Sequence, residues 1–143
     1  MTIEAVSTTY AVTVPSVGSV EVTVDSRGHG QPFLVLHGGA GPQSMAAFSQ
    51  LLAERDHNRV LTPIHPGFGG TPRPDGLTTV RWLAALYQEL LDDLALKNVT
   101  VIGNSIGGWI AAELALLTSP RIGRLVTSST TRISSGIRIL MLN

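Results

Sequence analysis

The stretch VTVIGNSIGGWIAAELAL, residues 99–116, decides the fold of this 143-residue chain. A short run rich in β-branched residues meets GNSIGG, and an apolar run follows that is long enough for a helix. Such a pattern is typical of a buried strand that leads straight into a helix. Ser105 stands at this junction between small residues. A serine in that place needs a structural reason, and as a nucleophile it would also need a base.

Strands and helices alternate along the rest of the sequence. Residues 3–25 alternate β-branched and polar side chains around the turn Pro-Ser-Val-Gly, which predicts a β-hairpin. The other predicted elements are strands over 32–39, 59–67, 98–103 and 122–128, and helices over 44–55, 78–96 and 106–120, the last ended by Pro120. This order predicts an α/β fold: a mostly parallel sheet with helices on both faces and an N-terminal antiparallel hairpin.

Two of the predicted helices carry apolar stripes that should be buried. In the helix over 78–96, large apolar residues recur at every fourth position: Trp82, Leu86, Leu90 and Leu94. The helix over 44–55 has Ser44 as its predicted N-cap. Its expected stripe consists of Met45, Phe48, Leu51 and Leu52.

The composition limits the function. Hydrophobic residues make up 43% of the chain and charged residues 14%, which suits one packed domain. Ten basic and ten acidic side chains cancel at pH 7, so neither a nucleic acid nor a membrane is predicted as a partner. The chain has no cysteine, no segment of about 18 apolar residues, and no signal-peptide pattern at its start. We therefore expect a cytoplasmic protein with no cofactor and, for want of paired ligands at regular spacing, no metal.

Ser105 completes the pattern G-x-S-x-G with Gly103 and Gly107. In a sharp strand-to-helix turn, small residues two positions before and after the serine relieve crowding of the backbone. The turn exposes the serine hydroxyl at the N-terminus of a helix, where free N–H groups and the helix dipole favour an oxyanion. The small residues thus have a structural reason.

Two further motifs follow other predicted strands. HGGAG (37–41) comes after the strand over 32–39, and HPGFGGT (65–71) follows the next strand. With the serine motif, these elements resemble the α/β-hydrolase fold family in kind and in order. The resemblance covers residues 3–128 and implies the N-terminal part of the family's core.

The resemblance implies a site for acyl chemistry. Ser105 matches the nucleophile, and the backbone N–H groups of Gly39 and Ile106 match the oxyanion-hole donors. The binding site is expected to include His37, Gly38 and Asn104. The implied reaction is hydrolysis of an ester, amide or activated C–C bond in a small molecule, by acyl transfer to Ser105 and attack of water.

The sequence departs from the family where the base should be. Family members carry the order Ser, Asp or Glu, then His, but here no histidine follows Ser105 and the only later acid is Glu113. Glu113 falls within the helix and is expected to point away from the site. The upstream His37 and His65 are expected to shape their loops, and the other two, His29 and His57, to be exposed. Any activity is therefore expected to be impaired.

The end of the chain has its own character. We expect residues 1–128 to form a partial, truncated core domain and residues 129–143 to be an atypical tail, as a truncation or a shifted reading frame would produce. The DNA after codon 143 tests this, because a frame with no further strands, Asp or His would count against it. The strand over 122–128 would then be an open edge and could self-associate. A catalytically inactive ligand-binding or self-associating module is the alternative to a hydrolase, and a poorly folding chain is a third.

Overall fold

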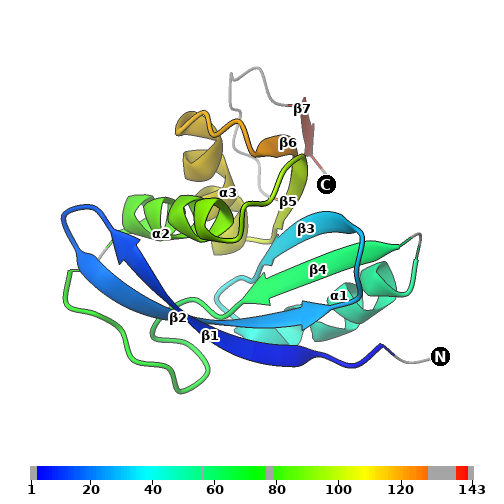
Figure 1. Ribbon diagram of the computed structural model, residues 1–143, viewed down its shortest axis with the longest axis horizontal. Coiled ribbons are helices and arrows are strands. Elements are labelled where there is room, and N and C mark those ends of the chain that lie inside the picture. Colours follow the sequence, from blue (N-terminus) through cyan, green and yellow to red (C-terminus); the bar gives the residue numbers. More distant parts are fainter. Residues whose placement is uncertain (1–2, 56, 77–78, 129–137, 142–143) are drawn as a thin grey trace.

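The computed structural model describes residues 3–55, 57–76, 79–128 and 138–141. They form one seven-stranded sheet in the order β1-β2-β4-β3-β5-β6-β7 (Figure 1). The strands are β1 (Val6–Val14), β2 (Gly18–Arg27), β3 (Gln31–Leu36), β4 (Asn58–Pro63), β5 (Val99–Gly103), β6 (Ile122–Thr127) and β7 (Arg138–Met141). The helices are the 3₁₀ turn η1 (Pro42–Met45), α1 (Ala46–Ala53), α2 (Val80–Asp93) and α3 (Ile106–Leu116).

The predicted strand directions are confirmed. β1 and β2 form an antiparallel hairpin, and β2 pairs antiparallel with β4. β3 pairs in parallel with β4 and with β5, and β5 pairs in parallel with β6. Because parallel strands end at the same edge of a sheet, the loops after β3, β4 and β5 start close together.

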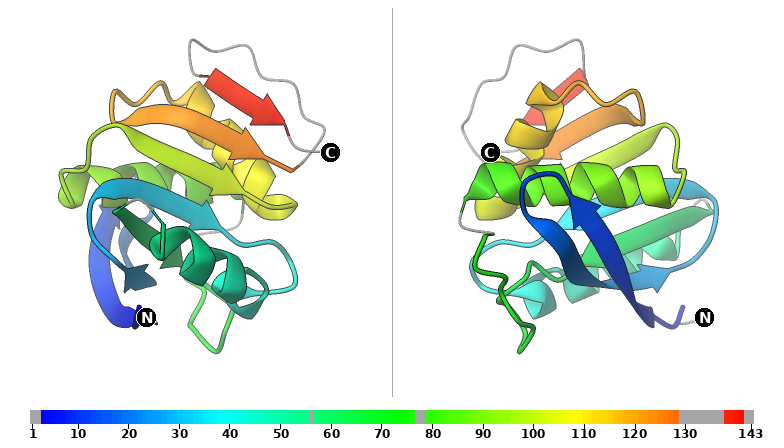
Figure 2. Two further views of the ribbon diagram at one scale, coloured as in Figure 1. Left: turned by 90° about the vertical axis from the view of Figure 1, so that its right-hand side faces the viewer. Right: turned by 60° about the vertical axis from the view of Figure 1, so that its left-hand side comes forward.

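Helices cover both faces of the sheet, as the sequence predicted. Leu34 and Leu36 of β3 belong to the core shared with α2 and α3. Val35, between them, packs in a second cluster with Met45 and Ala53, next to α1. Successive side chains of a strand point to opposite faces, so a continuous apolar strand supplies both cores. Figure 2 shows α1 on one face and the pair α2 and α3 on the other.

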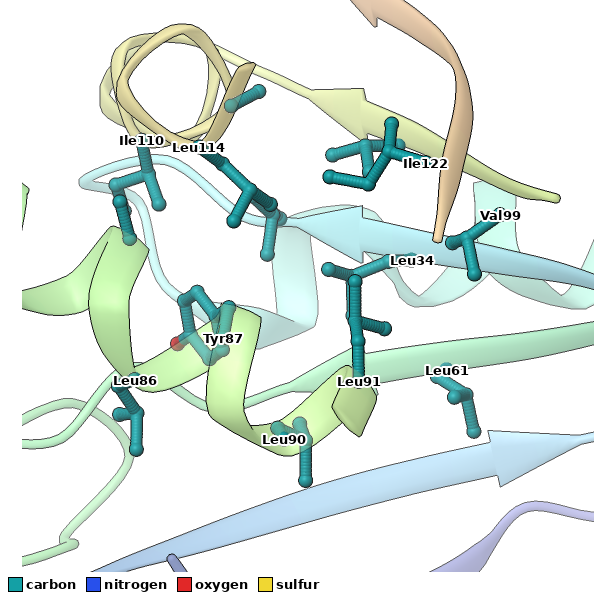
Figure 3. Packing of buried hydrophobic residues seen from close by; sticks show 14 of the residues in the cluster. Leu34, Leu61, Leu86, Tyr87, Leu90, Leu91, Val99, Ile110, Leu114 and Ile122 are labelled. Carbon is teal, nitrogen blue, oxygen red and sulfur yellow. The ribbon is translucent and has the colours of Figure 1, made fainter. Parts of the chain in front are cut away.

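Helix α2 packs into the larger core through a broader face than the predicted stripe. Leu86 and Leu90 are fully buried, whereas Trp82 and Leu94 are only half-buried. Fully buried neighbours extend the face on one side: Ala84, Tyr87 and Leu91. Figure 3 shows Tyr87 and Leu91 in the core with Leu86 and Leu90. A broad apolar stripe of this kind is the usual pattern for a helix that packs on a sheet.

The predicted start of α1 is wrong. The turn η1 precedes the helix, whose N-cap is Met45 with no side-chain capping bond. Ser44 lies inside η1, and its hydroxyl donates to the carbonyl oxygen of Gly41 at 2.6 Å. Pro42, which has no N–H to leave unpaired, starts a tight turn before the helix.

The predicted apolar stripe of α1 is also partly wrong. Phe48 is 40% exposed and Leu51 52% exposed, whereas Ser49 and Ala53 are buried. The hydroxyl of Ser49 hydrogen-bonds that of Thr62 on β4 at 2.9 Å. Small side chains with an internal hydrogen bond let this helix lie close to the strand, so its larger residues remain outside.

The C-terminal elements correct two further predictions. Helix α3 ends at Leu116, before Pro120. The edge of β6 is not open, because β7 pairs with it in parallel from Arg124↔Arg138 to Thr127↔Met141. The observation that favoured self-association through residues 122–128 is therefore removed. Of the predicted atypical tail, residues 129–137 and 142–143 lie outside the described residues.

Candidate active site

Ser105 lies in a strained turn between β5 and α3. Its backbone angles are φ 56° and ψ −118°, a region that residues with a side chain rarely adopt. The side chain is exposed and does not cap the helix. This is the geometry of a nucleophile elbow, and strain of this kind points to a functional constraint at the hydroxyl.

Close backbone contacts explain the glycines around the serine. A Cβ added at Gly107 would lie 2.1 Å from the carbonyl oxygen of Leu36 and 2.7 Å from that of His37. A Cβ at Gly103 would lie 2.3 Å from the carbonyl oxygen of Gly107. Only residues without a Cβ let the first turn of α3 approach the end of β3 this closely.

The loop after β3 lies directly beside the elbow. The N–H of Asn104 donates to the carbonyl oxygen of Leu36 at 3.1 Å. A Cβ added at Gly38 would lie 3.1 Å from Cβ of Ser105. The structure therefore brings Gly38 and Asn104 to the predicted nucleophile.

The two predicted oxyanion donors are available. In the part of the chain that the structure describes, neither the N–H of Gly39 nor that of Ile106 donates to another protein group. Ile106 is the first residue of α3, where N–H groups have no partner within the helix. Ile106 also lines a pocket of about 230 Å³ with Phe68, Val80 and Leu83.

The sequence analysis missed Ser128. Its hydroxyl accepts from the N–H of Ser105 at 3.3 Å and donates to Oδ1 of Asn104 at 2.7 Å. Ser128 thus ties the side chain of Asn104 to the elbow. The sequence could have predicted this contact. Ser128 directly follows β6, and β6 ends beside β5 in the parallel sheet, so the residues after the two strands are neighbours.

His37 and His65 are buried and fully engaged, as expected of loop-shaping residues. The N–H of His65 donates to Nε2 of His37 at 3.0 Å, and Nδ1 of His37 lies 2.8 Å from the carbonyl oxygen of Gly38. Nε2 of His65 lies 2.7 Å from the carbonyl oxygen of His37, and its Nδ1 lies 2.5 Å from the hydroxyl of Tyr87. The two rings stack with centroids 3.8 Å apart.

Burial keeps both histidines neutral. Desolvation lowers the pKa of His37, although its bond to Gly38 opposes the shift. Desolvation, with a smaller effect from the neighbouring His37, lowers the pKa of His65 from 6.5 to about 3. Burial also raises the pKa of Tyr87. Neither ring has a free nitrogen with which to take a proton from Ser105.

The remaining titratable candidates lie elsewhere. His29 and His57 are exposed, as predicted, with ring centroids 6.2 Å apart. Glu113 is half-buried and lines a different cleft with Trp109 and Arg81. Among the described residues no group of three or more His, Asp or Glu side chains is placed to hold a metal ion. No helix in the described ranges is long and apolar enough to cross a membrane.

Comparison with known proteins identifies the class. The family model described as alpha/beta hydrolase fold matches residues 31–140. The chain therefore belongs to the alpha/beta hydrolase fold family.

Two similar proteins are hydrolases of different kinds. The chain is 34% identical over 121 residues to 2-hydroxy-6-oxo-2,4-heptadienoate hydrolase of Pseudomonas putida strain F1, a match that covers 82% of this chain and 44% of that protein. It is 41% identical over 98 residues to the pimeloyl-[acyl-carrier protein] methyl ester esterase of Aromatoleum aromaticum, a match that covers 68% of this chain and 36% of that protein. The chain thus spans less than half the length of these relatives.

Solved structures support the same fold. An epoxide hydrolase from Vigna radiata superposes with a TM-score of 0.76 at 24% identity, covering 91% of this chain and 41% of that one. A thermophilic esterase from Thermogutta terrifontis superposes with a TM-score of 0.74 at 25% identity, covering 84% of this chain and 44% of that one.

A glycine substitution tests the close contact at the elbow. Replacing Gly107 with Ala should lower the free energy of unfolding by about 1–3 kcal/mol or more, because its Cβ would meet two carbonyl oxygens. The matched control is Gly39→Ala, whose Cβ meets nothing within 4 Å; it should change that free energy by less than about 0.5 kcal/mol. Urea unfolding measures both, and a Gly107→Ala chain as stable as the wild type would contradict the close approach.

Acid should destabilise the chain through the buried histidines. Between pH 6.5 and about 3, the unfolded chain binds a proton at His65 that the folded chain does not. The free energy of unfolding should therefore fall with decreasing pH, by up to about 1.4 kcal/mol per pH unit from this residue. Urea unfolding at several pH values should show a shallower dependence for His65→Gln and an unchanged one for the exposed His57→Gln. Equal slopes in all three chains would show that His65 is not held neutral.

Proposed function

We propose that this chain carries the nucleophile and the oxyanion hole of a serine hydrolase that cleaves an ester, amide or activated C–C bond in a small molecule. The observation that carries the proposal is the strained backbone of Ser105, an exposed residue that lies next to Gly38 and directly before Ile106 at the start of α3. A strained turn with a free nucleophile and free donors has no evident purpose in stability alone.

The reaction has two steps. Oγ of Ser105 attacks the carbonyl carbon, and the carbonyl oxygen becomes an oxyanion that accepts from the N–H groups of Gly39 and Ile106. The bond to the leaving group breaks, and that group departs with the proton from the serine. Water then hydrolyses the acyl-serine ester and restores the hydroxyl. Each oxyanion donor contributes about 10²–10³ in turnover in enzymes where one has been removed.

The proposed binding residues have distinct parts in this scheme. Gly38 leaves room beside Cβ of Ser105, and Asn104 is fixed by the hydroxyl of Ser128. The pocket next to Ile106 is largely apolar, with Phe68 and Leu83 among its lining residues. It suits the apolar part of a small acyl-type substrate. The activities named for the two relatives, on a heptadienoate and on a methyl ester, are both compatible with carbonyl chemistry of this kind.

These 143 residues on their own should turn over slowly. No histidine follows Ser105 in the sequence, and the hydrogen bonds and burial of His37 and His65 keep both from acting as its base. Loss of triad members costs about 10⁴ or more in turnover, while the oxyanion hole and binding alone retain roughly 10³–10⁴ over water. We therefore expect an activated reagent to acylate Ser105 at a measurable rate, whereas repeated turnover of a substrate should be slow.

A ligand-binding module without catalysis is the alternative. The pocket of about 230 Å³ beside Ile106 favours it, because such a pocket could bind a small apolar ligand without any bond being broken. The reactivity of Ser105 separates the two functions.

Labelling with a fluorophosphonate tests the proposal. The reagent carries its own leaving group, so we expect one covalent adduct at Ser105, located by peptide mass spectrometry. Ser105→Ala should abolish it, whereas Ser19→Ala, which removes an exposed serine side chain of β2 at the hairpin turn, should leave the rate unchanged. A folded wild-type chain that stays unlabelled would exclude the nucleophile and support the ligand-binding module.

A further inference from the structure

A series of buried, hydrogen-bonded side chains connects α2 with the glycine loop, residues 37–41 after β3. It begins at Tyr87, whose ring is fully buried in the apolar cluster between α2 and α3 (Figure 3). From there it passes through His65 and His37 and reaches the carbonyl oxygen of Gly38. The proposed reaction uses none of the three side chains directly, although a buried hydroxyl and two buried imidazoles are costly to desolvate.

The partners fix the direction of each hydrogen bond. Carbonyl oxygens only accept, so Nε2 of His65 donates to the carbonyl of His37, and Nδ1 of His37 donates to the carbonyl of Gly38. Nε2 of His37 accepts from the N–H of His65, which agrees with a neutral ring protonated at Nδ1. Nδ1 of His65 is then the acceptor, and the hydroxyl of Tyr87 is its donor.

The last hydrogen bond of this series holds the peptide unit between Gly38 and Gly39, which carries one of the proposed oxyanion donors. The carbonyl of Gly38 and the N–H of Gly39 belong to the same planar, trans peptide and point in opposite directions. Nδ1 of His37 holds that carbonyl at 2.8 Å, and the N–H of Gly41 also donates to it at 3.1 Å. Holding the carbonyl therefore fixes the direction of the N–H of Gly39, and hydrogen bonds in series polarise one another.

We propose that Tyr87 and His65 are positioning residues for the oxyanion hole, acting through His37 on the peptide that presents the N–H of Gly39. Tyr87 holds His65 in the tautomer that donates to the carbonyl of His37. His65 in turn supplies the backbone N–H that keeps Nε2 of His37 free of hydrogen. The proposal rests on the proposed function, because it assigns a purpose to the network only if Gly39 stabilises an oxyanion.

The matched test is Tyr87→Phe, which removes one hydroxyl and keeps the ring. We expect the second-order rate constant for acylation of Ser105 by a fluorophosphonate to fall about tenfold, a part of what loss of a whole oxyanion donor costs. Leu86→Val is the control, because it trims a fully buried side chain of the same helix without touching a polar group. It should lower stability and leave the acylation rate within about twofold of the wild type.

Nitrogen-15 NMR of the imidazole rings gives a readout independent of reactivity. In the wild-type chain, His37 should carry its hydrogen on Nδ1 and His65 on Nε2, and Tyr87→Phe should shift His65 toward a mixture of tautomers. A rate within twofold of the wild type in Tyr87→Phe, or the opposite tautomers in the wild type, would overturn the positioning role. If Tyr87→Phe does not fold, the tautomers of His37 and His65 in the wild-type chain still test the positioning role. An unlabelled wild-type chain with the expected tautomers would refute the proposed function instead.

Discussion

The site depends on how closely the first turn of α3 approaches the end of β3. The N–H of Asn104 donates to the carbonyl of Leu36, and Gly107 lies against the same carbonyl where no Cβ could fit. This contact sets the sharp turn at Ser105 and brings the glycine loop beside it. The loops that carry Gly38 and Ser105 lie side by side because both start at the same edge of a parallel sheet.

A set of buried, hydrogen-bonded side chains connects the loops at this edge of the sheet. The stacked rings of His37 and His65 join the loops after β3 and β4, and Tyr87 joins both to α2. Their low basicity suits them to hold backbone groups in place and makes them poor proton acceptors. Every ring nitrogen of these two histidines is already engaged in a hydrogen bond within the protein.

Much of the fold follows from hydrophobic periodicity and glycine spacing. The strand, the serine turn and the helix over 99–116 were predictable because only small residues allow that turn, and the continuous apolar strands indicated a sheet covered on both faces. The hydrogen bonds of His37 and His65 agree with the loop-shaping roles expected of them, and the oxyanion donors stay a prediction from the order of three motifs. The family of the chain supports that interpretation.

Other features depend on tertiary packing that no local pattern reports. Phe48 and Leu51 look like core residues of an amphipathic helix, but α1 packs through Ser49 and Ala53 because their small size allows a close approach. Residues 138–141, which pair with β6 as strand β7, carry no strong strand signal of their own. The contact of Tyr87 with His65 spans two elements, and a tyrosine in an apolar stripe gives no sign of its hydroxyl's partner.

We propose that Ser105 faces an oxyanion hole made by the N–H groups of Gly39 and Ile106. The most direct test of this proposal is a crystal structure of the chain after reaction with a phosphonate ester, whose tetrahedral phosphorus mimics the intermediate. We expect phosphorus bonded to Oγ of Ser105 and a phosphoryl oxygen about 2.7–3.1 Å from both N–H groups. An adduct at Ser105 with that oxygen directed away from both donors would contradict the proposal.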